Sequence, residues 1–162
     1  MHTSKAVDAV RSAVTALNEG KIDGYLEQFD PSSKRWLVGA ATPLSLTDIS
    51  DNLHQMQAAF AGLHLEEELL FGDERFVCAR WRLRGRHVGD YLGFAPTGHS
   101  MEVEGVDLWT MRDGRIARYR AFYDMNDVAR QLAIAPAPGS RAEKAVVALQ
   151  RLQARMLRRR GG

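Results

Sequence analysis

Hydrophobic residues recur at helical spacing in the first part of the chain and at strand spacing after it. Apolar positions return every three or four residues over 4–19, 23–30 and 47–62, which predicts three amphipathic helices. Ser4 stands where it can cap the first of them. The apolar residues of that helix are Val7, Val10, Val14 and Leu17. A short strand-like stretch at 34–39 separates the second helix from the third.

From Leu63 onward the apolar residues alternate with polar ones, which is typical of half-buried strands. The four predicted strands are 63–71, 75–87, 99–111 and 115–124. Turn signals separate them closely enough to form an antiparallel meander. Helices followed by such a meander give an α+β order. We therefore expect a curled antiparallel sheet wrapped over the N-terminal helices, the cystatin-like cone, which joins both parts into one core with a pocket.

The register of the final hairpin decides which side chains face inward. A two-residue turn at Asp113-Gly114 would set Arg112 opposite Arg115 and would mix charged with aromatic residues on both faces. We therefore predict a three-residue loop over 112–114 with a left-handed glycine. This register places Gly105 opposite Ala121 and Asp107 opposite Tyr119. The inner face then carries Met101, Val103, Gly105, Asp107, Trp109, Ala117, Tyr119, Ala121 and Tyr123.

The strand at 75–87 separates its residues in the same way. Trp81, Leu83 and His87 share the inner face, whereas four arginines alternate on the outer face. These arginines are Arg80, Arg82, Arg84 and Arg86. Glu66 and Glu68 on the neighbouring strand can meet them, so we expect a cross-strand charge ladder or a subunit contact rather than an anion or nucleic-acid site. The outward Phe76, Leu108 and Phe122 favour a homodimer or a higher homo-oligomer.

Composition limits the class of protein. The 162 residues are 45% hydrophobic and 26% charged, as in an ordinary globular domain. Cys78 is the single cysteine, so the chain has neither an internal disulfide nor the cysteine framework of a zinc finger or an iron–sulfur protein. No apolar run is long enough for a membrane span, and the first residues lack the apolar core of a signal peptide. We expect a cytoplasmic protein.

The basic charge is concentrated at the C-terminus. Residues 140–162 contain seven arginines and lysines against one acid, whereas the rest of the chain is net acidic. The acidic body argues against nucleic-acid binding. We divide the chain into a cone domain at 1–134, an Ala/Pro linker at 135–139 and a basic amphipathic helix at 140–162. That helix should dock on a surface, either in its own dimer or on an acidic partner or anionic surface.

Asp107 is the candidate for chemistry. It is the one carboxylate on the inner face, where Gly105 and Ala121 should leave an open space beside it. A carboxyl group in an apolar cavity has a raised pKa, which suits proton transfer near neutral pH. His87 could assist as a proton carrier or hydrogen-bond donor. The walls for a flat, oxygenated ligand would be Trp81, Trp109, Tyr119 and Tyr123. The alternative is a structural Asp107, bonded to a tyrosine or an arginine.

Other catalytic templates are absent from the sequence. The chain has no nucleophile elbow, phosphate-binding loop, dinucleotide fingerprint or zinc-protease motif. His54, His64 and His99 lie on unrelated elements and do not suggest a metal site. We therefore expect chemistry without a cofactor or a metal.

Several motifs in the second half resemble the SnoaL-like polyketide cyclases of the nuclear transport factor 2-like superfamily. They are Gly85-Arg86-His87-Val88-Gly89, Gly93-Phe94-Ala95-Pro96-Thr97-Gly98, Asp113-Gly114-Arg115-Ile116, and Asp124 followed by Gln131-Leu132. The resemblance covers about residues 4–134. It implies the curled-sheet cone and a cofactor-independent aldol condensation that closes a ring of an aromatic polyketide ester.

The resemblance also implies a catalytic aspartate assisted by a histidine on the neighbouring strand. Counted from Asp113-Gly114, the histidine position is occupied here by Asp107 and the aspartate position by Ala121. Since alanine cannot exchange a proton, we hypothesise that Asp107 supplies the carboxylate to the same cavity from the adjacent strand. Asp124 matches a further family aspartate, and its outward parity indicates a structural or dimer-contact role.

Two classes of function follow. The first is a cofactor-independent enzyme of secondary metabolism that closes a ring in a hydrophobic, polycyclic or polyketide-derived substrate, with isomerisation, hydroxylation and epoxide opening as alternatives on the same fold. The second is a non-catalytic binding or assembly module that has lost the acid–base pair. A closed cavity with Asp107 pointing into it favours the enzyme, and a filled cone favours the module.

Overall fold

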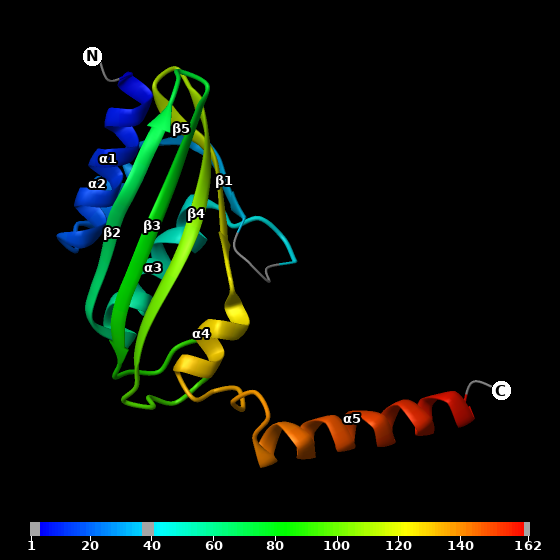
Figure 1. The fold of residues 1–162 in the computed structure, drawn as a ribbon. Coiled ribbons are helices and arrows are strands. Elements are labelled where there is room, and N and C mark those ends of the chain that lie inside the picture. Colours follow the sequence, from blue (N-terminus) through cyan, green and yellow to red (C-terminus); the bar gives the residue numbers. More distant parts are fainter. Residues whose placement is uncertain (1–3, 37–40, 161–162) are drawn as a thin grey trace.

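The computed structural model describes residues 4–36 and 41–160, which form an α+β fold with one curled, open sheet (Figure 1). The helices are α1 (Lys5–Asn18), α2 (Ile22–Leu26), α3 (Leu46–Ala59), α4 (Met125–Gln131) and α5 (Arg141–Arg160). The strands are β1 (Phe29–Trp36), β2 (Phe60–Gly72), β3 (Phe76–His87), β4 (Ser100–Arg112) and β5 (Arg115–Tyr123). Their order is β1-β5-β4-β3-β2, with β1 parallel to β5 and the other pairs antiparallel. The predicted fold class is confirmed.

Capping residues set where the first and third helices begin. Ser4 Oγ accepts a hydrogen bond from Val7 N at 3.2 Å, as predicted for α1. The helix predicted from residue 47 begins earlier, because Ser45 and Asp48 form a reciprocal capping box. None of the helices in the described ranges is long and apolar enough to cross a membrane.

The second helix is shorter than predicted. It ends at Leu26, and Phe29 already belongs to β1, where it pairs with Ile116 of β5. The pairing is interrupted until Lys34, a stretch that includes Pro31, which has no N–H to donate. β1 thus lies at 29–36 rather than at the predicted 34–39, of which 37–39 fall outside the described residues.

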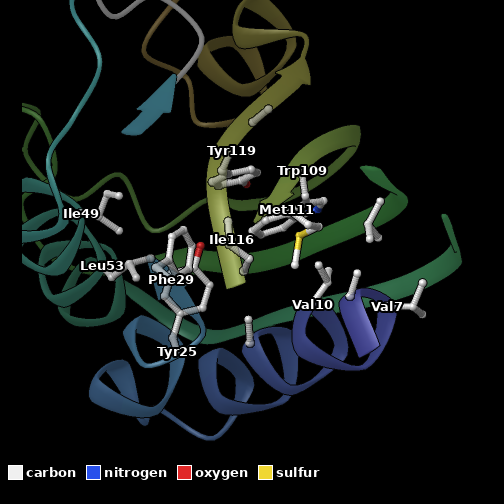
Figure 2. Packing of buried hydrophobic residues seen from close by; sticks show 14 of the residues in the cluster. Val7, Val10, Tyr25, Phe29, Ile49, Leu53, Trp109, Met111, Ile116 and Tyr119 are labelled. Carbon is white, nitrogen blue, oxygen red and sulfur yellow. The ribbon is translucent and has the colours of Figure 1, made fainter. Parts of the chain in front are cut away.

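The main core lies between the three N-terminal helices and the concave face of the sheet. Figure 2 shows Ile49 and Leu53 of α3 on the Phe29 side of one core cluster and Val7 and Val10 of α1 on its Met111 side. From the sheet side, this core is completed by Trp109, Met111, Ile116 and Tyr119. All of these side chains are nearly or fully excluded from solvent, so burial of apolar surface holds the helices on the sheet.

The final hairpin differs from the prediction in its turn and agrees in its faces. Asp113 and Gly114 both have positive φ and form a two-residue turn, with Arg112 opposite Arg115. The extra residue sits further along β5 as a β-bulge at Ala117. Because this bulge shifts the phase of β5, the arginines still turn outward and the aromatic residues inward. The predicted inner face is therefore right, whereas the predicted three-residue loop is wrong.

The outer face carries the predicted charge ladder. Glu68 contacts Arg80 at 3.0 Å and Arg82 at 2.6 Å, and Glu102 contacts Arg84 at 2.7 Å. Glu66 of β2 and Glu104 of β4 add further ion pairs to this network of three strands. Arg80, Arg82 and Arg84 thus have carboxylate partners, which favours the structural interpretation for them, whereas Arg86 has no ion pair among the described residues. Beside the ladder, Phe76, Leu108 and Phe122 are exposed.

The C-terminal helix projects away from the cone (Figure 1). None of its described residues belongs to either core cluster. Its apolar side chains Val146, Leu149, Leu152 and Leu157 are at least half exposed. The predicted helix is thus present, and within one chain it leaves its apolar side open to solvent.

Candidate active site

Asp107 lies in the middle of β4 on the inner face of the sheet. It faces Ala79 of β3 on one side and Ala121 of β5 on the other, and only 2% of its surface is exposed. The predicted three-residue loop places Asp107 opposite Tyr119, but the bulge at Ala117 sets it opposite Ala121 instead. Asp107 Oδ1 has no hydrogen-bond partner among the described residues. The carboxylate is therefore buried, with one oxygen unpaired among the described residues.

The surroundings of Asp107 favour its protonated form more than water does. Burial raises the pKa of Asp107 from 3.8 to about 6, while Trp81, Tyr119 and the positive charge of Arg35 act in the opposite direction. A carboxyl group with this pKa is mostly ionised at neutral pH and can still return a proton, as general acid–base catalysis requires.

Aromatic side chains line the inner face around Asp107. The rings of Trp109 and Tyr119 stack with centroids 4.0 Å apart and an interplanar angle of 7°. Trp81 meets Tyr123 edge-on at 6.0 Å. The Nε1 atoms of both tryptophans are buried and have no hydrogen-bond partner among the described residues. The four predicted wall residues therefore come together around the carboxylate.

The open space predicted beside Asp107 is filled. A Cβ atom added to Gly105 would lie 2.3–2.8 Å from three ring atoms of Trp81, which shows that the indole rests directly on this glycine. Gly105 thus makes room for Trp81 rather than for a ligand. Two hollows, of about 520 and 330 Å³, border α1, and neither is lined by Asp107.

Arg35 is a site residue that the sequence analysis missed. It projects from β1 onto the inner face, where its guanidinium carbon lies 4.6 Å from the centre of the Tyr119 ring. Burial disfavours its charge, but Tyr119, Tyr25 and Asp107 outweigh this effect and hold the pKa of Arg35 above its ordinary value. The sequence has no signal for this facing, because the alternate burial of Ser33 and Arg35 emerges only in the fold.

His87 does not join Asp107. It lies eight residues beyond Ala79, the partner of Asp107, which is about 25 Å along β3. Its ring stacks on Phe60 with centroids 5.1 Å apart, and Thr97 N donates to its Nδ1 at 3.4 Å. Its Nε2 is buried without a partner among the described residues. The structure thus separates the two residues predicted to act together.

Two further predictions concern residues outside this cluster. Asp124 caps α4, because its Oδ1 accepts hydrogen bonds from Asn126 N and Asp127 N. This contact supports the structural role over a dimer contact. The described ranges contain no group of three or more histidine, cysteine, aspartate or glutamate residues that could hold a metal ion.

Comparison with known proteins identifies the family. The sequence profile described as "SnoaL-like polyketide cyclase" matches residues 7–132. The chain belongs to this family. It is 32% identical to an aklanonic acid methyl ester cyclase of Streptomyces galilaeus, over 80% of this chain and 91% of that one. It is 29% identical to a nogalonic acid methyl ester cyclase of Streptomyces nogalater, over 74% of this chain and 90% of that one.

Solved structures support the fold independently. TsrD from Streptomyces laurentii superposes with a TM-score of 0.73 at 20% identity, over 83% of this chain and 99% of that one. IdmH from Streptomyces antibioticus superposes with a TM-score of 0.68 at 24% identity, over 79% of this chain and 98% of that one. The SnoaL-like fold therefore accounts for the cone, and α5 lies beyond the residues matched by the family profile.

The burial of Asp107 predicts an unusual pH dependence of stability. Since its pKa is higher in the folded chain than its ordinary value of 3.8, the unfolded chain loses this proton first, and stability falls as the pH rises from about 4 to 6. Asp107→Asn removes this loss. The stability of the variant minus that of the wild type, measured as the free energy of unfolding, should therefore be about 2 kcal/mol greater at pH 8 than at pH 4.5.

Urea denaturation at both pH values measures this difference. Glu104→Gln, on the exposed face of the same strand, is the control and should show no such gain. Equal effects of Asp107→Asn at both pH values would mean that Asp107 titrates as an ordinary carboxyl group.

Proposed function

We propose that this SnoaL-like protein is an enzyme of antibiotic biosynthesis that closes a carbon ring of a polyketide ester by acid–base catalysis. The observation that carries the proposal is the buried Asp107, whose Oδ1 is unpaired among the described residues and whose pKa is raised to about 6. The relatives named as methyl ester cyclases support the substrate class. Trp109 and Tyr119 provide the stacked aromatic wall that a flat polyketide would need.

The reaction follows from the position of the carboxylate. Asp107 removes a proton from the carbon next to the ester carbonyl, and the electron pair left on that carbon forms a bond to a ketone carbon of the same molecule. The ketone oxygen then takes the proton back from Asp107. One C–C bond forms, the C=O of the ketone becomes C–OH, and the product is an isomer of the substrate. Asp107 ends in its starting state, as a catalyst must.

Access to Asp107 requires movement of the inner side chains. Because the Trp81 ring covers Gly105, a ring-sized substrate can reach the carboxylate only when this indole shifts. Trp81 contacts Tyr123 at its edge, so the two rings form the part of the inner wall that would have to adjust. Binding energy from the polycyclic part of the substrate would drive this displacement.

A direct assay tests the function. The purified protein is incubated in D₂O with the methyl ester of aklanonic acid, the compound in the name of its relatives. We expect a cyclised isomer in liquid chromatography with mass detection, and deuterium in recovered substrate at the carbon next to the ester. Neither product nor exchange, with binding still detectable, would instead favour the non-catalytic module, which the packed cone and Ala121 support.

A further inference from the structure

A second set of unpaired polar atoms lies on the inner side of β1. Ser33 is 2% exposed and Arg35 is 8% exposed. Ser33 Oγ and the Nε and Nη1 atoms of Arg35 are buried and have no hydrogen-bond partner among residues 4–36 and 41–160. Burial of an arginine is costly unless its N–H groups are bonded, and native structures rarely leave such groups unpaired. These atoms therefore need an explanation beyond packing.

The backbone and the aromatic stack hold Arg35 in place. Its main-chain N donates to Leu44 O at 3.1 Å, and its O accepts from Leu44 N at 2.8 Å. On the other side, Arg35 pairs with Tyr119 in the parallel ladder, and its guanidinium lies over the Tyr119 ring. Tyr119 is in turn stacked on Trp109. The positive charge is therefore fixed before any ligand arrives, which is the condition for effective electrostatic stabilisation.

Arg35 and Asp107 influence each other without being joined. Arg35 pairs with Tyr119 of β5, and Asp107 faces Ala121 two residues further along the same strand, so both lie in the same part of the interior. In agreement, each shifts the pKa of the other. Yet Asp107 Oδ1 and two nitrogens of Arg35 are all without hydrogen-bond partners among the described residues. A carboxylate and a guanidinium that formed an ion pair would be joined by direct hydrogen bonds. Asp107 and Arg35 therefore each have buried polar atoms that are left for a ligand to bond.

We propose that Arg35 and Ser33 form a binding subsite for a negatively charged oxygen of the ligand, such as an enolate, phenolate or carboxylate. The assignment rests on the proposed function in one respect, namely which oxygen is bound during turnover. When Asp107 takes the proton, the electron pair spreads onto the ester carbonyl oxygen, and the N–H groups of Arg35 stabilise the charge that develops there. Arg35 thus acts on the oxygen while Asp107 acts on the adjacent carbon, and no other reactant is needed.

A binding experiment tests the subsite without requiring catalysis. The probes are anthraquinone-2-carboxylate and its uncharged methyl ester, followed by quenching of tryptophan fluorescence at about pH 5.5, where the probe is ionised and much of Asp107 is protonated. We expect Arg35→Gln to weaken carboxylate binding at least about 10-fold and ester binding less than about 2-fold, since only the carboxylate loses a charge-assisted bond. Arg120→Gln, an exposed arginine on β5, is the matched control.

Two further variants keep the test decisive if Arg35→Gln does not fold. Arg35→Lys keeps the charge and should retain most of the preference for the carboxylate, and Ser33→Ala should reduce it by about 3-fold. Equal losses for both probes in the folded variants, or no loss for either, would overturn the subsite. Normal binding of the carboxylate together with a negative cyclase assay would overturn the proposed function while supporting the subsite.

Discussion

Asp107→Asn should lower kcat/KM for ring closure at least about 100-fold at pH 8, because an amide cannot accept the proton that starts the reaction. The variant is nearly isosteric, so the contacts of the aromatic walls should be kept. In the wild-type protein, kcat/KM should rise as the pH passes about 6 and then level off, since the reaction needs the ionised carboxylate. Initial rates of isomer formation between pH 5 and 9 measure both effects.

The control for this experiment is Glu104→Gln. Glu104 lies on the same strand but on the opposite face, where it pairs with Arg80 and Arg82. Its loss should leave kcat/KM within about 2-fold of wild type, since a surface ion pair contributes little. An Asp107→Asn variant that is as active as this control would remove Asp107 from the mechanism and would redirect attention to Tyr119 and Tyr123.

Ala121→Asp should destabilise the protein by at least about 3 kcal/mol at pH 8, because it buries a second carboxylate directly opposite Asp107. Ala121 is 5% exposed, so water cannot shield the two negative charges from each other. The loss should become smaller as the pH falls through about 6, where Asp107 accepts a proton. Urea denaturation at several pH values measures it. Ala121→Asn, of similar size and uncharged, separates the effect of charge from that of volume.

The double variant Asp107→His with Ala121→Asp should recover stability that Ala121→Asp alone loses. It places a histidine on β4 and an aspartate on β5, which is the arrangement implied by the family resemblance. An imidazole beside a carboxylate can share a proton with it, so at least half of the stability lost in Ala121→Asp should return. If the double variant is no more stable than Ala121→Asp, then packing at this position, and not repulsion, limits what β5 can carry.

Strand periodicity was enough to predict the inner face of the sheet but not the pairing of its strands. Asp107, Trp109 and Tyr119 were assigned correctly because a charged and an aromatic set alternate along both strands. The exact partners depend on where the extra residue is accommodated. A positive-φ turn with a bulge at Ala117 and a longer loop without one produce the same two faces, so the facing pattern cannot distinguish them.

Two failures of the sequence analysis have a different cause: Arg35 was not predicted as a site residue, and the space predicted beside Asp107 is filled. Arg35 lies on a strand whose pairing is parallel and non-local, so nothing near it in the sequence indicates that it faces Tyr119. The space beside Asp107 was inferred from the small size of Gly105, but on a sheet a small residue can equally make room for a large neighbour. Trp81 is that neighbour, because it is directly opposite Gly105 across the β3–β4 ladder.

The facing of Asp107 and Ala121 bears on how such a protein can change over time. Two residues that share one rung of a sheet project their side chains toward the same point, so an ionisable group can be exchanged from one strand to the other while its position relative to a ligand is largely conserved. A lineage could pass through a form with the acid on either strand and keep the same reacting atoms in reach. If Asp107 is the acid–base group, as proposed, comparisons that follow individual positions record the loss of a catalytic residue where the chemistry has crossed from β5 to β4.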